Sequence, residues 1–278
     1  MTDHLGPAPG TAAGAAPPEP EAPAIRPYIV GLLDVLGFSA WVEREDLASI
    51  VATYRELVER AFIRYTARGG LSTIRVKGGH IFAITRAPRV AYFSDTILLW
   101  CPLDRPFVDE FVGRCSSILC EALAMGIPLR GAITIGEAVL DEKTSTYIGR
   151  PIVEAANLEK GQNWIGLCLG NSAMWPPFVA QLHGANIIEY PAPMKAAYVE
   201  YASPVVVDWP RRWREDERGD LRARLTELNA DERFAAYWEN TARFADESAA
   251  RHNWFKYPDK IPADACLRLI SEDEAGLE

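Results

Sequence analysis

The chain has 278 residues, of which 49% are hydrophobic and 24% charged, and its formal net charge is −9. A chain of this length and composition can bury a full core in one large domain or two small ones. The acidic balance argues against a general nucleic-acid binder, which normally carries a basic surface, and no apolar run reaches the length of about 18 residues that indicates a membrane span.

The first 26 residues are mostly Ala, Pro, Gly and Glu. This composition cannot pack a core, so it predicts a disordered tail. The tail has no apolar run of signal-peptide length and no basic start, and the five cysteines of the chain form no CxxC pair. Both observations favour a cytoplasmic protein with reduced thiols.

After the tail, short β-rich runs alternate with helical segments. Residues 28–33 predict an apolar strand, and residues 40–68 predict a long helix because their apolar side chains recur near helical spacing. The elements that we expect next are an irregular hairpin at 71–84, strands at 89–93 and 96–101 with Ser94 and Asp95 between them, a helix at 107–125, strands at 129–135 and 138–140, and a helix that opens at Gly149.

The last third of the chain predicts strands at 165–169, 186–190 and 199–207, followed by a charged helical stretch at 211–250. This mixed order of elements indicates an α+β fold. We therefore expect a tail at 1–26, one α+β domain at 27–205 and a helical extension at 206–278 with a structural or dimerising role.

Two carboxylates fall at strand ends. Asp34 ends the first predicted strand, and Asp95 lies at the tip between two later strands. Hard cations such as Mg2+ and Mn2+ take carboxylate oxygens as ligands, so the pair predicts a two-metal phosphoryl-transfer site. Taken singly, Asp34 can also be a helix-capping residue and Asp95 a turn-forming residue.

Four segments of the chain resemble, in the same order, the successive motifs of class III nucleotidyl cyclases, over about residues 28–165. The segments are Leu33-Asp34-Val35-Leu36-Gly37-Phe38-Ser39, Tyr92-Phe93-Ser94-Asp95, Leu129-Arg130-Gly131-Ala132-Ile133-Thr134-Ile135-Gly136 and Gly149-Arg150-Pro151-Ile152-Val153-Glu154-Ala155-Ala156-Asn157-Leu158. The resemblance implies a ferredoxin-like catalytic core that works as a head-to-tail homodimer, with metal ligands from one protomer and base-binding and transition-state residues from the other.

The resemblance also implies roles for individual residues. Two Mn2+ or Mg2+ ions would be bound by Asp34, Asp95 and the backbone carbonyl of Val35, and would activate the ribose 3′-hydroxyl for attack on the α-phosphate. The turn after Asp34 supplies backbone N–H groups at a helix start, which favours anions. The residues expected to hold the β- and γ-phosphates are Leu36, Gly37, Phe38 and Ser39.

The chain departs from the family at its catalytic helix. The transition-state asparagine and arginine of the family fall on Val153 and Asn157, so the arginine is missing from its usual place. Arg130 and Arg150 are candidates to replace it, because a guanidinium can clamp phosphate oxygens with two hydrogen bonds. Both arginines can instead be ion-paired surface residues.

The base-reading positions of the family align with Ala91 and Thr146, and neither the pair that reads adenine nor the pair that reads guanine is present. The chain is similar in this respect to the pyrimidine cyclases of the bacterial Pycsar antiphage systems. The resemblance implies a lyase that converts UTP to 3′,5′-cyclic UMP and pyrophosphate, and a separate effector that the product activates. The alternatives are a cytidylate cyclase that makes cyclic CMP, or an inactive homologue that acts as a nucleotide sensor or regulatory partner.

Overall fold

The computed structural model describes residues 24–67, 73–77, 80–84, 88–103, 108–174, 187–229 and 234–251, and only the backbone of residues 66–67, 73–77 and 80–84. The tail expected at 1–26 lies almost entirely outside the described residues, as does the part of the expected helical extension that follows Arg251. None of the helices in these ranges is long and apolar enough to cross a membrane.

Most of the strands form one mixed sheet in the order β4-β5-β1-β6-β8-β10-β9, with β7 paired to β6, while β2 and β3 pair with each other. Neighbours in the large sheet are antiparallel except β6 and β8, which run parallel. The strands are β1 (Arg26–Val35), β2 (Thr73–Lys77), β3 (His80–Ile84), β4 (Arg89–Phe93), β5 (Thr96–Pro102), β6 (Leu129–Asp141), β7 (Thr146–Gly149), β8 (Leu167–Gly170), β9 (Ile187–Glu189) and β10 (Ala202–Val207).

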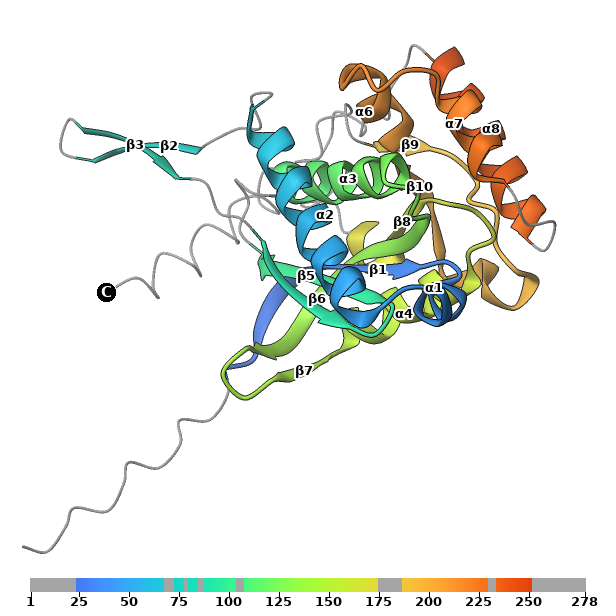
Figure 1. The fold of residues 1–278 in the computed structure, drawn as a ribbon. Helices are drawn as coiled ribbons and strands as arrows, with labels where there is room; N and C mark the ends of the chain where they lie inside the picture. Colours follow the sequence, from blue (N-terminus) through green and yellow to red (C-terminus); the bar gives the residue numbers. More distant parts are fainter. Residues whose placement is uncertain are drawn as a thin grey trace, which may run out of the picture.

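Helices cover both faces of the large sheet. Figure 1 shows α2 and α3 against one face, α4 on the other side of the strands, and α6, α7 and α8 gathered beside β9 and β10. The α-helices are α1 (Phe38–Arg44), α2 (Leu47–Ala67), α3 (Val108–Ala124), α4 (Arg150–Gly161), α6 (Trp209–Glu215), α7 (Leu221–Leu228) and α8 (Ala235–Ala250), and the short 3-10 helices are η2 (Asn171–Met174) and η3 (Ala196–Tyr201). The fold therefore combines one large mixed sheet with several helices, which is consistent with the predicted α+β class.

Strand β1 lies between β5 and β6 and is buried on both faces. Its side chains alternate between the faces, as in any strand. Ile29 and Leu33 belong to the larger core with α2 and α3, whereas Val30 and Leu32 belong to a second core with α4. The same alternation places Asp34 on the α4 face, at the end of the strand.

The single helix predicted at 40–68 is two helices, α1 and α2. The break between them has a local cause, because the Asp46 carboxylate accepts a hydrogen bond from the Ser49 N–H at 3.0 Å and caps the second helix. The helix also begins earlier than predicted, at Phe38 rather than Ala40. The strands predicted at 89–93 and 96–101 are confirmed as β4 and β5, although β5 continues to Pro102.

The two strands predicted at 129–135 and 138–140 are one continuous strand, β6. Pairing with β1 carries the strand through the intervening glycine, since Tyr28 lies opposite Gly136 and Pro27 opposite Glu137. The sequence did not predict β7, which folds back on β6 after a turn in which Asp141 accepts bonds from the Lys143 N–H and the Thr144 hydroxyl. Gly149, predicted to open the third helix, is the residue that joins β7 to α4.

The predicted helical stretch at 211–250 contains three helices in its described part, α6, α7 and α8. Asp208 and Asp220 cap α6 and α7 by accepting backbone N–H bonds, and each cap starts a new helix. The predicted strand at 199–207 begins only at Ala202, after η3.

The predicted domain boundary between residues 205 and 206 falls inside β10. Trp209, Leu225 and Phe244, which follow the boundary, belong to the same hydrophobic core as Ile29 and Leu33 of the central strand. The described part of the C-terminal helices is thus packed into the core of the sheet domain rather than appended to it.

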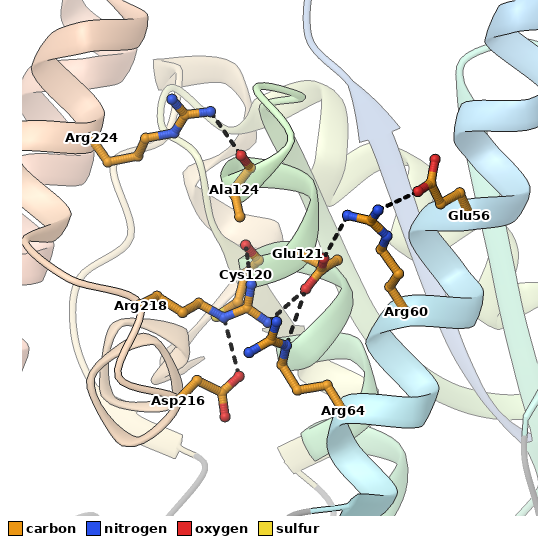
Figure 2. Close-up of polar contacts among 9 residues, drawn as sticks. All are labelled: Glu56, Arg60, Arg64, Cys120, Glu121, Ala124, Asp216, Arg218 and Arg224. Atoms are coloured by element: carbon orange, nitrogen blue, oxygen red, sulfur yellow. Dashed lines mark hydrogen bonds and ion pairs between the residues drawn. The ribbon is translucent and has the colours of Figure 1, made fainter.

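One cluster of charged residues, here called the Glu121 cluster, joins α2, α3 and the chain between α6 and α7 (Figure 2). Glu121, with 5% of its side chain exposed, lies 2.8 Å from Arg218, 3.5 Å from Arg64 and 3.9 Å from Arg60. Asp216 lies 3.2 Å from Arg218 on its other side. The cluster therefore ties three separate parts of the chain through one buried carboxylate.

Candidate active site

The two predicted metal-binding carboxylates come from neighbouring segments of the sheet. Asp34 is the penultimate residue of β1 and lies opposite Thr96, the first residue of β5. Asp95 is in the β4–β5 turn, and its carbonyl accepts a hydrogen bond from the Val35 N–H at 3.0 Å. The predicted placement of both carboxylates at strand ends is confirmed, and the backbone bond holds the two segments together.

Asp34 also lies beside an arginine and a glutamate. Arg130, opposite Asp34 on β6, places Nη2 at 3.5 Å from Asp34 Oδ2 and at 2.5 Å from Glu159 Oε1 on α4. Arg130 Nη1 donates to the Gln162 carbonyl at 3.2 Å and to the Tyr237 hydroxyl at 3.3 Å. The guanidinium is thus already engaged by four groups, which favours a positioning role for Arg130 over direct contact with phosphate.

The pKa of Asp34 is raised from 3.8 to about 8. Burial is the main cause, and the neighbouring Glu159 and Asp95 carboxylates raise the pKa further, while Arg130 lowers it. The site therefore concentrates more negative charge than its own arginine offsets.

This shift predicts that Asp34→Asn raises the melting temperature of the metal-free protein. The unfolded chain releases the Asp34 proton near pH 3.8 and the native protein near pH 8, so wild-type stability falls as the pH rises between those values. Asparagine does not titrate, so the difference in stability between the variant and the wild type grows as the pH rises from about 3.8 to about 8. Above pH 8 the difference is constant. Thermal unfolding from about pH 5 to about pH 9 measures the difference.

Asp141→Asn is the matched control for that experiment, with the opposite sign. The Thr144 hydroxyl and the Lys143 N–H hydrogen-bond to the Asp141 carboxylate and hold its pKa below the usual value. Loss of that carboxylate is expected to lower stability slightly at neutral pH. An Asp34→Asn variant that is less stable than the wild type at pH 8 would contradict the proposed charge imbalance.

An aromatic cluster lies next to the two carboxylates. Tyr54 of α2 donates its hydroxyl to the Ser94 carbonyl at 3.4 Å and stacks on Trp41, with ring centroids 5.8 Å apart. Burial and the nearby Asp95 and Asp34 carboxylates raise the pKa of Tyr54. Because its hydroxyl stays protonated, Tyr54 can donate a hydrogen bond beside the site at any physiological pH.

The turn predicted to hold phosphates is only partly available. The Leu36 N–H donates to the Pro128 carbonyl at 3.0 Å, so this backbone donor is used within the chain. Gly37 adopts the left-handed conformation at φ 78° and has open space above it. Phe38 packs against Trp41 and Tyr54, and Ser39 is exposed at the start of α1. The turn therefore presents an open surface at Gly37 and Ser39.

The two predicted base-reading positions do not lie beside Asp34 in the same chain. Thr146 is opposite Asp141, at the far end of β6 from Arg130. Ala91 is on β4, and Tyr147, next to Thr146, packs against Phe93 with ring centroids 5.1 Å apart. Ala91 therefore lies with Tyr147 on the α4 face, whereas Thr146, which precedes Tyr147 on β7, points to the opposite face of the sheet.

The remaining predicted residues lie on α4. Arg150 is exposed at the first position of the helix, and Asn157 is half-buried two turns later. Val153, in the place of the family asparagine, is 62% exposed. No hydrogen bond or ion pair joins any of these residues to Asp34 in the described part of the chain.

Sequence reasoning missed Glu159, which contacts Arg130 and influences Asp34. A signal for it exists, because Glu159 continues the buried stripe of Ala155 and Leu158 at helical spacing. A carboxylate on an otherwise apolar stripe indicates a buried partner. Tyr237 reaches Arg130 from 107 residues away in the sequence, and nothing in the local sequence indicates this contact.

The carboxylates fit a cation that is bound jointly with substrate. Within the described ranges, no group of three or more His, Cys, Asp and Glu side chains could hold a metal ion by itself. Mg2+ usually binds one or two carboxylates together with substrate phosphates, an arrangement that Asp34 and Asp95 can supply. The raised pKa of Asp34 supports this fit, since a divalent cation would offset the repulsion among the acidic groups.

A scan of the chain against protein-family models finds no match, and a search among curated proteins finds no similar one. Function is therefore inferred from the residues and contacts of this chain.

Proposed function

We propose that the chain is a pyrimidine nucleotidyl cyclase of the class III type, with a ferredoxin-like core, which converts UTP to 3′,5′-cyclic UMP and pyrophosphate. The observation that carries the proposal is the meeting of Asp34 and Asp95 at the ends of adjoining strands, joined by the Val35–Asp95 backbone bond. Capping and turn formation explain each aspartate singly, but they do not explain why two acidic groups share a site that raises the pKa of one of them.

In the proposed reaction, the ribose 3′-oxygen forms a bond to the α-phosphorus, the bond from that phosphorus to the bridging oxygen breaks, and pyrophosphate leaves while the hydroxyl proton passes to solvent. Two Mn2+ or Mg2+ ions, when bound, would polarise the phosphate oxygens and acidify the hydroxyl. Asp34 and Asp95 would hold these ions, together with the Val35 carbonyl. Arg130 would orient Asp34, which it contacts at 3.5 Å.

The proposed active form is a head-to-tail homodimer with composite sites. Ala91, Thr146, Arg150 and Asn157 would serve the site of the other protomer, as the resemblance to class III cyclases implies. Two exposed apolar side chains on the α4 side of the sheet support a dimer face there, namely Phe93 at 43% and Val153 at 62% exposed.

The proposed product is a second messenger for antiphage defence in the cytoplasm, which would activate a separate effector protein. This part of the proposal is supported by the resemblance of the motifs and by the missing purine-reading residues at Ala91 and Thr146. Neither a nucleic acid nor a membrane is proposed as a partner.

Incubation of the purified protein with each of ATP, GTP, CTP and UTP plus Mn2+, followed by mass spectrometry, tests the proposal. We expect cyclic UMP from UTP and no cyclic product in EDTA, because the carboxylates need a cation to act on phosphate. We also expect the specific activity to rise with protein concentration, since the site is composite.

The outcomes separate the candidates. If the protein makes cyclic CMP from CTP and no product from the other nucleotides, the proposed cyclase mechanism stands and the substrate is CTP instead of UTP. Cyclic product from a proven monomer, or in EDTA, would contradict the composite two-metal site. No product from any nucleotide would favour an inactive homologue that binds nucleotide, for which the substitution of Val153 at the asparagine position provides a reason.

A further inference from the structure

The C-terminal helix α8 reaches the candidate site through Tyr237. The Tyr237 hydroxyl accepts a hydrogen bond from Arg130 Nη1 at 3.3 Å, and the Arg130 guanidinium lies 6.0 Å from the centre of the Tyr237 ring. Arg130 in turn contacts Asp34. A residue far from the metal-binding motifs in sequence is therefore one side chain away from a proposed metal ligand.

Other contacts of α8 fix the position of Tyr237. The Asn240 amide donates to the Asn163 carbonyl at 2.7 Å, and the Thr241 hydroxyl accepts from the Ile165 N–H at 2.8 Å. Phe244 packs edge-on against Trp164, with ring centroids 4.7 Å apart. These contacts clamp the start of α8 to the segment that follows α4, so Tyr237 is held rigidly beside Arg130.

The two terminal nitrogens of the Arg130 guanidinium, Nη1 and Nη2, have different partners. Nη1 donates to Tyr237 and to the Gln162 carbonyl, while Nη2 lies 2.5 Å from Glu159 and 3.5 Å from Asp34. The contact with Glu159 is a close ion pair, whereas the hydrogen bond that Nη2 donates goes to Asp34. At 3.5 Å this bond is loose, because a charged N–H···O hydrogen bond is normally about 2.7–2.9 Å long. The acceptors on Nη1 hold the guanidinium toward α4 and α8.

We infer that Tyr237 is a positioning residue for the candidate site, which keeps the Arg130 guanidinium from closing on Asp34 and so leaves Asp34 available to a divalent cation. The inference rests on the proposed function, because the cation is the one proposed there for Asp34. Without the Tyr237 hydroxyl, the guanidinium is free to turn toward Asp34 and to form a two-bonded pair with it. The arginine then competes with the cation for the same carboxylate.

A double-mutant cycle on the full chain tests this inference, with Mn2+ affinity measured by electron paramagnetic resonance. Tyr237→Phe keeps the ring and removes the hydroxyl, and we expect it to weaken Mn2+ binding about three- to tenfold. In the Arg130→Met background, the same substitution is expected to change nothing. If Arg130→Met fails to fold, Arg130→Lys takes its place in the double-mutant cycle. Lysine keeps the positive charge but lacks the planar guanidinium group, which can hydrogen-bond to several acceptors at once.

Tyr190→Phe is the matched control, since Tyr190 packs against Phe244 of α8 but its contacts do not include Arg130. It should leave Mn2+ affinity unchanged. The inference would be overturned if Tyr237→Phe bound Mn2+ as tightly as the wild type or more tightly. It would also be overturned if the substitution weakened Mn2+ binding equally with and without Arg130. Either result would leave the proposed function standing. A wild-type protein whose Mn2+ binding does not depend on Asp34, by comparison with Asp34→Asn, would overturn both.

Discussion

Asp95→Asn is expected to abolish the formation of cyclic nucleotide while the protein stays folded. Replacing a residue that only supports a metal ligand lowers activity about 10- to 100-fold. Replacing a proposed direct ligand should therefore lower the rate at least about 100-fold. Asp95 is half-buried in a turn, and its recorded hydrogen bond uses the backbone carbonyl, which asparagine keeps. Initial rates of cyclic UMP formation, with circular dichroism as the test of folding, measure the effect.

Asp246→Asn is the matched control for that substitution. Asp246 is on α8 in an exposed ion pair with Arg222, far from the candidate site, and such pairs contribute little to stability. Its activity should equal that of the wild type. A folded Asp95→Asn protein that keeps more than about a tenth of the wild-type rate would remove Asp95 from the proposed metal site.

Glu121→Ala should destabilise the protein by about 3 kcal/mol, the low end of the range for breaking a buried ion pair. Its partner Arg218 is equally buried, with 5% of its side chain exposed, and would lose its closest carboxylate. Asp216, at 3.2 Å, still compensates part of that charge, which is why the low end applies. The free energy of unfolding in urea measures the loss, which is a large share of the total stability of a typical domain.

The control for this prediction is Glu227→Ala. Glu227 pairs with Arg224 at 2.8 Å, but 68% of its side chain is exposed, so its loss should cost less than about 1 kcal/mol. The comparison separates burial from pairing, because both glutamates contact an arginine at the same distance. Equal losses in the two variants would show that the Glu121 cluster does not depend on burial.

The parts of the fold that the sequence predicted well are those with local signals. The strands on either side of Asp95 are short apolar runs and were confirmed, as were the strand-end positions of both aspartates. The prediction of one long helix at 40–68 failed because a capping aspartate, Asp46, divides the helical pattern. Prediction also failed where strand pairing overrides a glycine, as in β6.

The surroundings of Asp34 could be predicted only in part, because they depend on contacts between distant segments. The short motif around Asp34 indicates a carboxylate at a strand end, but not that Arg130 lies opposite it. The contacts of Arg130 with Glu159 and Tyr237 follow from the packing of α4 and α8, which a single sequence does not encode in any local pattern. The proposed ligands are therefore visible in the sequence, whereas the groups that tune them are not.

The central place of β1 has a consequence for synthesis on the ribosome. This apolar strand emerges first among the described elements, yet its two partners, β5 and β6, end at Pro102 and Asp141. At about 5–20 residues per second, the ribosome needs roughly 5 to 20 seconds to deliver the second partner. Until β5 is made, the nascent chain carries an apolar strand with both edges unpaired, and one edge stays unpaired until β6 follows. Chaperones that cover such edges should increase the yield of folded protein.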